Sequence, residues 1–283
     1  MAGQRTYLQQ LSEAKHVLEQ RLAGETPTIG LILGSGLGEL AEQVEDAVRI
    51  PYTAIPYFPE STVQGHAGQF VVGRLAGKSV IVMQGRFHFY EGYSMKKVVF
   101  PIYVMKMLGI QTLVITNAAG GMNRAFKAGD LMLIRDHMNW TGDNPLIGVN
   151  HSELGVRFPD MSRAYHRPYI ELAKSVAASI TTGVGQALDL VEGVYCGISG
   201  PSYMTPSELK LLAGVGGDAV GMSTVPEVIA ASHCGLKVLG ISCITDMAIG
   251  EELAPLTHEQ VVEVAHRTKP DFMQLVKGFI KAV

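Results

Sequence analysis

The sequence is poor in cysteine, in net charge and in long apolar runs. Its three cysteines, Cys196, Cys234 and Cys243, are odd in number and widely spaced, so we expect buried thiols in a reducing compartment rather than disulfides or a zinc site. The net charge of −3 gives no basic field for nucleic acid. No apolar run approaches the roughly 18 residues of a membrane helix, and the first residues carry no apolar signal region. These absences predict a cytoplasmic protein that binds neither nucleic acid nor membranes.

The apolar residues that are present are numerous enough to build a large core. Of the 283 residues, 47% are hydrophobic and only 17% are charged, which argues against disorder. Strand-like and helix-like segments alternate along the whole chain, without a linker-like change in composition and without internal repeats. We therefore expect one α/β domain over residues 1–283, with a central mixed sheet that binds ligands at its strand ends.

Hydrophobic periodicity predicts where the elements lie. Helices are expected over residues 5–23, 95–108 and 165–181, and three more should begin near 206, 225 and 257, each after a threonine that starts a capping-box pattern. The expected strands are Thr28–Leu33, Gln69–Leu75, Ser79–Met83, Thr112–Thr116, Leu131–Ile134, 189–197, 217–221 and 237–243. Residues 136–163 are expected to form a long irregular segment, which in a compact domain usually serves a function.

Residues 84–92 carry the clearest functional pattern, because polar side chains alternate with aromatic ones just after a predicted buried strand. If the backbone stays extended, Arg86, His88 and Tyr90 lie on one face, with Phe87 and Phe89 on the other. A guanidinium beside an imidazole suits an oxyanion such as phosphate, and the phenol suits the organic group that meets it. The alternative is a polar strand end that mixes core and surface residues.

Three other strand ends have the same anion-binding character. Ser35 lies in Gly34–Gly38, where Glu39 takes the place of the third glycine of a dinucleotide fingerprint and so excludes a dinucleotide site. Asn117–Gly121 is expected to be a loop of small residues after a strand, and Ser223 precedes a capped helix. Each end alone is equally consistent with a structural turn. Together, four such ends in one sheet favour a phosphate site.

Six blocks of the chain, in their order, resemble the trimeric purine nucleoside phosphorylases. They are Gly34–Gly38, Gly65–Gly68, Gln84–Gly92, Thr116–Gly121, Gly200–Thr205 and Gly221–Glu227, and the resemblance runs over nearly the full length. It implies a homotrimer of single α/β domains, each with a distorted, mixed, barrel-like sheet flanked by helices. It also implies a pentosyltransferase of purine salvage that splits purine nucleosides or deoxynucleosides with inorganic phosphate and uses no metal or organic cofactor.

The resemblance also implies roles for individual residues. Phosphate would be held by Ser35, His66, Arg86, His88, the backbone of Ala118 and Ser223. The ribose would contact Tyr90, Met222, His258 and Phe158, the last reaching in from the neighbouring subunit of the trimer. The base would contact Tyr203, Met204, Val220, Thr245 and Asp246. The catalytic residues would be His88, Ser223 and Asp246.

The chemistry of the reaction fits these residue types. Breaking the bond between ribose and purine develops positive charge on the sugar and negative charge on the base. A phosphate dianion held under the sugar stabilises the first charge, and a hydrogen-bond donor at purine N7 stabilises the second. Because the work is electrostatic, no covalent nucleophile is needed.

Two positions depart from the family members that act on inosine and guanosine. Where those carry Glu and Asn, this sequence carries Met204 and Asp246. A 6-oxopurine offers an N1–H donor to Glu, whereas a 6-aminopurine has an acceptor at N1 and a donor amine at C6. Met204 avoids the repulsion between Glu and that acceptor, and Asp246 can accept from the amine or, when protonated, donate to N7. Both changes predict a preference for adenosine.

Three alternatives remain open at the level of sequence. The two changes would only relax selectivity in an enzyme that acts mainly on inosine or guanosine. In the second alternative, the chain is a methylthioadenosine phosphorylase. His258 argues against this, because the thioether of that substrate needs an apolar neighbour. Or it would bind purine or phosphate without catalysis, which the set of Ser35, Arg86, His88 and Ser223 disfavours.

Overall fold

Nine strands form one sheet in the computed structural model, which describes residues 5–22, 24–34, 36–62, 67–183, 185–253 and 257–283. They are β1 (Ile29–Leu33), β2 (Glu45–Pro51), β3 (Gln69–Leu75), β4 (Lys78–Gln84), β5 (Thr112–Gly121), β6 (Leu131–Trp140), β7 (Leu190–Ile198), β8 (Ala219–Gly221) and β9 (Lys237–Met247). Their order in the sheet is β2-β3-β4-β1-β5-β8-β7-β6-β9.

A second pairing of β9, with β5, closes part of this sheet into a ring. Strands β5, β8, β7, β6 and β9 pair in turn and return to β5, while β1, β4, β3 and β2 continue from β5 as an open sheet. The pairings are mixed: β1 runs parallel to β4 and β5, whereas β6 runs antiparallel to β9. The expected α/β fold with a mixed, barrel-like sheet is therefore confirmed.

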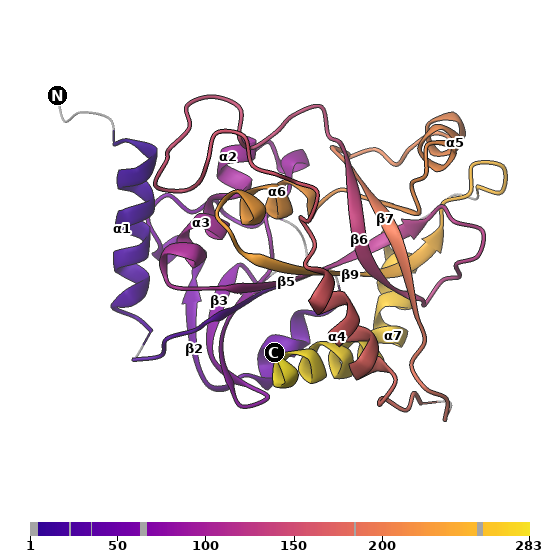
Figure 1. Ribbon diagram of the computed structural model, residues 1–283, viewed down its shortest axis with the longest axis horizontal. Helices are drawn as coiled ribbons and strands as arrows, with labels where there is room; N and C mark the ends of the chain where they lie inside the picture. The colour runs from indigo at the N-terminus through magenta and orange to yellow at the C-terminus, as the bar shows by residue number, and fades with distance from the viewer. Residues whose placement is uncertain (1–4, 23, 35, 63–66, 184, 254–256) are drawn as a thin grey trace.

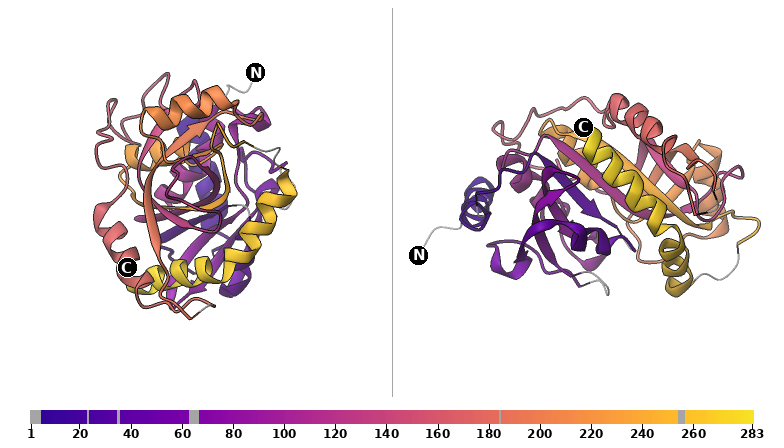
Figure 2. Two further views of the ribbon diagram at one scale, coloured as in Figure 1. Left: turned by 90° about the vertical axis from the view of Figure 1, so that its right-hand side faces the viewer. Right: turned by 90° about the horizontal axis from the view of Figure 1, so that it is seen from below.

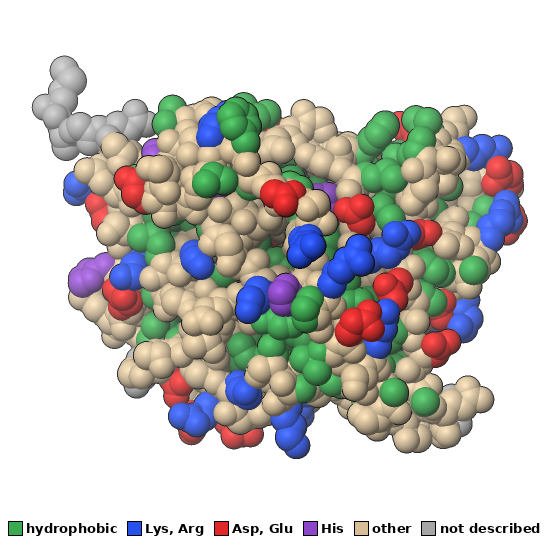
Figure 3. Space-filling view, in the orientation of Figure 1, with side chains coloured by type: hydrophobic (Ala, Val, Ile, Leu, Met, Phe, Trp, Pro, Cys, Tyr) green, Lys and Arg blue, Asp and Glu red, His purple; other side chains and the backbone are tan. Residues whose placement is uncertain are grey.

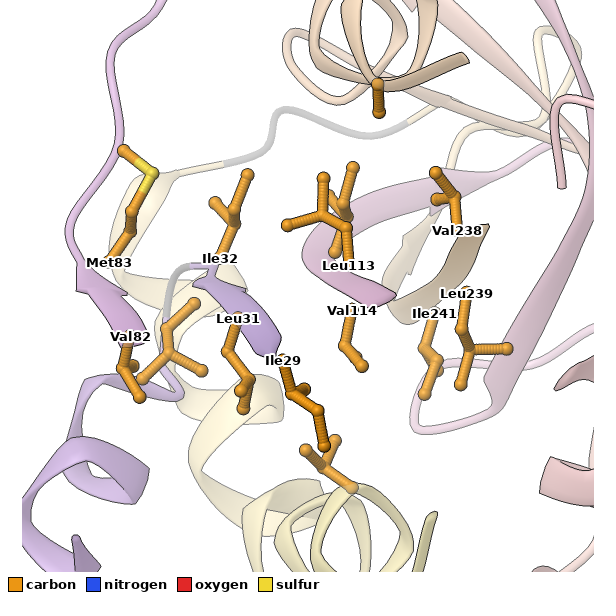
Figure 4. Packing of buried hydrophobic residues seen from close by; sticks show 14 of the residues in the cluster. Ile29, Leu31, Ile32, Val82, Met83, Leu113, Val114, Val238, Leu239 and Ile241 are labelled. Carbon is orange, nitrogen blue, oxygen red and sulfur yellow. The ribbon is translucent and has the colours of Figure 1, made fainter. Parts of the chain in front are cut away.

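The central strands are apolar on both faces because helices cover both. All five residues of β1 are buried, as expected for a parallel strand between two others, and its Leu31 and Ile32 point to opposite sides (Figure 4). Figures 1 and 2 show α3 and α6 on one side of the strands and α4 and α7 on the other. The α-helices are α1 (Tyr7–Glu19), α2 (Met95–Val98), α3 (Phe100–Met107), α4 (Arg167–Ala177), α5 (Pro206–Gly214), α6 (Val225–His233) and α7 (His258–Ala282).

Charged side chains of both signs share the face of the molecule drawn in Figure 3. On the face drawn in Figure 3, Lys and Arg side chains are intermingled with Asp and Glu, and hydrophobic side chains lie between them. Among the described helices, none combines the length and the apolar character needed to cross a bilayer.

The structure corrects several predicted boundaries. Residues 117–121 are strand rather than loop, because their small side chains let β5 pair closely with both β9 and β8. The irregular segment begins at 141 rather than 136, since residues 136–140 pair with β7 after a register shift. The helix expected over 95–108 is two helices, α2 and α3, with Pro101 in the first turn of the second. No strand was expected at β2, an edge strand that is mostly exposed and so lacks a clear apolar pattern.

Candidate active site

A pocket of about 820 Å³ opens where the ends of β5, β8 and β9 meet the segments that follow β4 and β7. The first turns of α7 contribute Gln260, Val261 and Val264 to its wall. The predicted site residues that line it are Arg86, His88, Tyr90, Ala118, Tyr203, Met204, Val220, Met222, Ser223, Thr245 and Asp246. The fold therefore gathers into one pocket side chains that lie more than half the chain apart in sequence.

Arg86 is fixed at the pocket by a buried ion pair. Its Nε and Nη2 donate to the two carboxylate oxygens of Glu227 at 3.1 and 2.5 Å, and both side chains are almost fully buried. Its Nη1 donates to the carbonyl oxygen of Thr116 at 2.6 Å. This fork sets the plane of the guanidinium, and the carboxylate balances its charge, so anion recognition here depends on the placement of donors.

The backbone around His88 and Tyr90 differs from the expected continuous strand. His88 is extended, with φ −118° and ψ 150°, but residues 89–91 form a 3₁₀ turn. Tyr90 therefore reaches the pocket through that turn, not through strand alternation, and its ring stacks on the imidazole of His88 with centroids 4.7 Å apart. Phe87 was expected on the opposite face, and it is buried in the core. The three side chains meet at one site, although the predicted reason for it was wrong beyond His88.

Glu91 orients the His88 ring. The Nδ1 of His88 lies 3.0 Å from Glu91 Oε1, and the backbone N–H of His88 donates to the same oxygen at 2.7 Å. Burial raises the pKa of Glu91, but hydrogen bonds from His88 and Thr62 outweigh it and lower that pKa to about 2. A carboxylate acceptor at Nδ1 keeps a proton on that nitrogen and fixes the tilt of the ring at the pocket. The other ring nitrogen, Nε2, can donate a hydrogen bond when the ring is protonated.

The junction between β8 and α6 brings Ser223 to the same end of the pocket. Its hydroxyl lies 3.2 Å from the hydroxyl of Thr224, which also accepts a hydrogen bond of 2.8 Å from Asn117 Nδ2. The backbone N–H of Thr224 donates to Glu227 Oε2 at 2.9 Å, which joins this junction to the Arg86 ion pair. The Arg86 and Ser223 donors and the His88 imidazole thus line one pocket, and the imidazole adds a further donor for an oxyanion when it is protonated.

The opposite end of the pocket is formed around Asp246. Ala119 of β5 pairs with Ile244 of β9, whereas Gly120 pairs with Asp246, so Thr245 is the extra residue of a β-bulge. The Thr245 hydroxyl donates to Asp246 Oδ1 at 2.9 Å. Burial raises the pKa of Asp246, and the hydrogen bond from Thr245 partly offsets this effect. The bulge therefore presents a carboxyl group with increased affinity for a proton.

Four predicted residues are not placed in this pocket by the described structure. Ser35 and His66 lie outside the described residues, and His258 is the first residue of α7 but its side chain also lies outside them. Phe158 is 86% exposed and lines a different hollow, beside Arg157. Its predicted contact with the site of a neighbouring subunit requires an oligomer, so the structure of a single chain does not test this prediction.

Sequence reasoning missed several residues that shape the site. Glu227 was recognised only as a capping residue, and no sequence signal linked it to Arg86, which lies 141 positions away. Asn117 and Gly120 line the pocket from β5, although the segment looked like a loop. Within the described residues, no group of three or more His, Cys, Asp or Glu side chains is arranged to hold a metal ion.

Comparison with known proteins agrees with this geometry. A family model described as "Phosphorylase superfamily" matches residues 28–281. "Purine nucleoside phosphorylase 1" of Geobacillus stearothermophilus is 55% identical over 271 residues, which are 96% of either chain. The solved purine nucleoside phosphorylase of Schistosoma mansoni superposes in its complex with inosine (TM-score 0.91, 40% identity, 99% and 98% of the chains) and in its complex with adenosine (TM-score 0.88, 41% identity, 96% of each). The chain belongs to the phosphorylase superfamily, and its relatives there are purine nucleoside phosphorylases.

Proposed function

We propose that this protein is a purine nucleoside phosphorylase with a preference for 6-aminopurine nucleosides such as adenosine. It would convert a purine nucleoside or deoxynucleoside and inorganic phosphate into free base and (deoxy)ribose 1-phosphate, in the cytoplasm and without a metal or organic cofactor. The observation that carries the proposal is one pocket that is lined both by donors suited to an oxyanion and by Met204 and Asp246. A nucleoside with phosphate beneath its sugar needs both sets of residues at once, one to bind the phosphate and the other to bind the base.

The anion end would hold the phosphate that attacks the sugar. Arg86, Ser223 and the protonated form of His88 can supply donors, and Ala118 lines the same pocket and is proposed to add its backbone. Ser35 and His66 are proposed to add to this set. The bound dianion would stabilise the positive charge that develops on the ribose as the bond to the base breaks. Tyr90, stacked on His88, and Met222 would flank the sugar, and His258 is proposed to meet its 5′ end.

The base end would recognise the purine and take up its developing negative charge. Asp246 can accept a hydrogen bond from a 6-amino group, and in its protonated form it can donate to N7, which its raised pKa favours. Met204 offers no charge to repel an unprotonated N1. Tyr203, Val220 and Thr245 complete this wall. Solved relatives bind both inosine and adenosine, so the preference is argued from the two side chains rather than from the fold.

A panel of substrates tests the proposal. Adenosine, inosine, guanosine and methylthioadenosine are each incubated with and without phosphate, and release of free base is measured. We expect release only with phosphate, with the highest kcat/KM for adenosine. Release of base without phosphate would identify a hydrolase, and no release at all would identify a binding protein. A highest kcat/KM for methylthioadenosine or inosine would identify the corresponding alternative specificity.

The variant Asp246→Asn isolates the preference. An amide cannot supply a carboxyl proton and can donate to O6, so the ratio of kcat/KM for adenosine to that for inosine should fall. A mismatched buried hydrogen bond costs about 1–3 kcal/mol, which corresponds to a change of about fivefold to 150-fold. Asp189→Asn, which removes an exposed carboxylate away from the pocket, is the charge-matched control. An unchanged ratio in the Asp246 variant would refute the proposed role.

We further propose that the protein is a homotrimer in which Phe158 completes the neighbouring site. Phe158 is 86% exposed, and Ile147, Val149 and Val156 of the same segment are 64%, 74% and 65% exposed, so this segment offers apolar area to a second copy. Analytical ultracentrifugation gives the mass of the assembly. Phe158→Ala should raise the KM for the nucleoside while the assembly stays intact, and a monomeric, fully active protein would contradict this proposal.

A further inference from the structure

The chain makes an uncommon turn between β8 and α6, centred on Thr224. The backbone there has φ 72° and ψ −53°, and the N–H of Val225 donates to the carbonyl oxygen of Ser223 at 2.7 Å. This is a classic γ-turn, which is rare and strained, and a β-branched residue at positive φ adds to the strain. Glycine would adopt the turn without that cost. The buried threonine side chain therefore has a role that outweighs the strain.

The hydroxyl of Thr224 links two polar side chains that line the pocket. Asn117 Nδ2 can only donate, so the hydrogen bond of 2.8 Å makes Thr224 Oγ1 an acceptor. The hydroxyl has one proton of its own, and Ser223 Oγ, at 3.2 Å, is in position to accept it. When it does, the proton of Ser223 is directed away from Thr224. The three groups then form a row of donors from Asn117 through Thr224 to Ser223, and the last faces the pocket.

The backbone of the same residue supports the second donor of the anion end. The N–H of Thr224 donates to Glu227 Oε2, and both oxygens of that carboxylate accept hydrogen bonds from Arg86. One buried residue thus lies beside the Ser223 hydroxyl and is linked through Glu227 to the Arg86 guanidinium. Thr224 itself does not line the pocket, so it can act only through its neighbours.

We propose that Thr224 is a positioning residue that turns the O–H of Ser223 toward the phosphate. The inference rests on the proposed function, because it assumes that the anion in the pocket is phosphate. A phosphate dianion accepts hydrogen bonds, so a serine that presents its proton binds it and a serine that presents a lone pair repels it. By donating to Ser223 Oγ, Thr224 occupies a lone pair of that oxygen and leaves the Ser223 proton free to point at the phosphate.

Thr224→Val tests this role, since it keeps the size and the branching of the side chain and removes the hydroxyl. We expect the KM for phosphate to rise about tenfold, in line with loss of a charge-assisted hydrogen bond, while the KM for the nucleoside changes less than about twofold. Thr224→Ser keeps the hydroxyl and should restore the phosphate KM. Thr112→Val is the matched control, because it removes a threonine hydroxyl bonded to Tyr169 at the far end of β5.

A double-mutant cycle separates orientation from general structural damage. If Thr224 acts through Ser223, Thr224→Val should change the phosphate KM of a Ser223→Ala enzyme by less than about twofold. The inference would be overturned if the two substitutions raised the phosphate KM independently, so that their fold-changes multiply in the double variant. It would also be overturned if the phosphate KM of Thr224→Val stayed within twofold of wild type. Thermal unfolding reports whether the variants fold, and Thr224→Ala takes the place of the valine variant in the cycle if that one does not. Failure of the proposed function itself is distinct, because the wild-type protein would then show no phosphate-dependent cleavage.

Discussion

Replacing Gly120 with alanine would add one methyl group beneath the base end of the pocket. A Cβ at this position would lie 3.0 Å from Asp246 Oδ2 and 3.0 Å from the Cβ of Ala248. Gly120 is not among the glycines with positive φ, so the backbone tolerates alanine and the effect comes from crowding. Because Thr245 holds Asp246 Oδ1 at 2.9 Å, relief requires the carboxyl group to turn and Oδ2 to move by a few tenths of an ångström.

This displacement should weaken the proposed hydrogen bond between Asp246 and the purine. Partial loss of a buried hydrogen bond of about 1–3 kcal/mol predicts that kcat/KM for adenosine falls about tenfold, with a smaller fall for inosine. The KM for phosphate should stay within about twofold, because the anion end of the pocket is formed by other residues. Steady-state kinetics with adenosine and inosine, at varied phosphate, measures all three quantities.

Gly121→Ala is the matched control for this prediction. It adds the same methyl group one residue further along β5, where it would meet Ile244 at 2.9 Å and Met247 at 3.0 Å instead of Asp246. Gly121 does not line the pocket. If both variants change the ratio of adenosine to inosine activity equally, or if neither changes it, the reasoning that links Gly120 to Asp246 is refuted.

Three further predictions concern charged groups of the pocket. Glu227→Ala removes the carboxylate that balances the buried Arg86 charge and should lower the free energy of unfolding by about 3–5 kcal/mol, measured by chemical denaturation; a loss below about 1 kcal/mol would contradict it. The pKa of Glu91 is lowered from 4.5 to about 2, so its stabilisation is present above pH 4.5 and is lost as the pH falls toward 2. After allowance for solvent screening this amounts to roughly 1–2 kcal/mol, and acid unfolding of Glu91→Gln should lack that dependence. Because the pKa of Asp246 is raised, kcat/KM for adenosine should fall as the pH rises through it, and Asp246→Asn should lack this limb of the pH profile.

The sequence predicted many of the residues that line the pocket but not their geometry. Side-chain type and position after a strand identified Arg86, His88 and Ser223, because strand ends in an α/β sheet meet at one edge. The 3₁₀ turn at 89–91 and the bulge at Thr245 were not predicted, because no local sequence pattern indicates them. The bulge depends on the pairing of β9 with β5, which is distant in sequence. Residues 117–121 resembled a loop because close pairing with β8 and β9 favours small side chains, which are also common in loops.

Closing five strands into a ring has a consequence for the motions of the protein. Strand β5 belongs both to the ring and to the open sheet, and it pairs with β1, β8 and β9. Local opening that frees its amide hydrogens must break ladders on two sides, so β5 should exchange with solvent only in the largest unfolding events. Asn117, Ala118 and Gly120 of the pocket lie on this strand. The part of the pocket wall that β5 forms is thus among the most persistent parts of the molecule, and fluctuations that admit a ligand have to come from the segments around it.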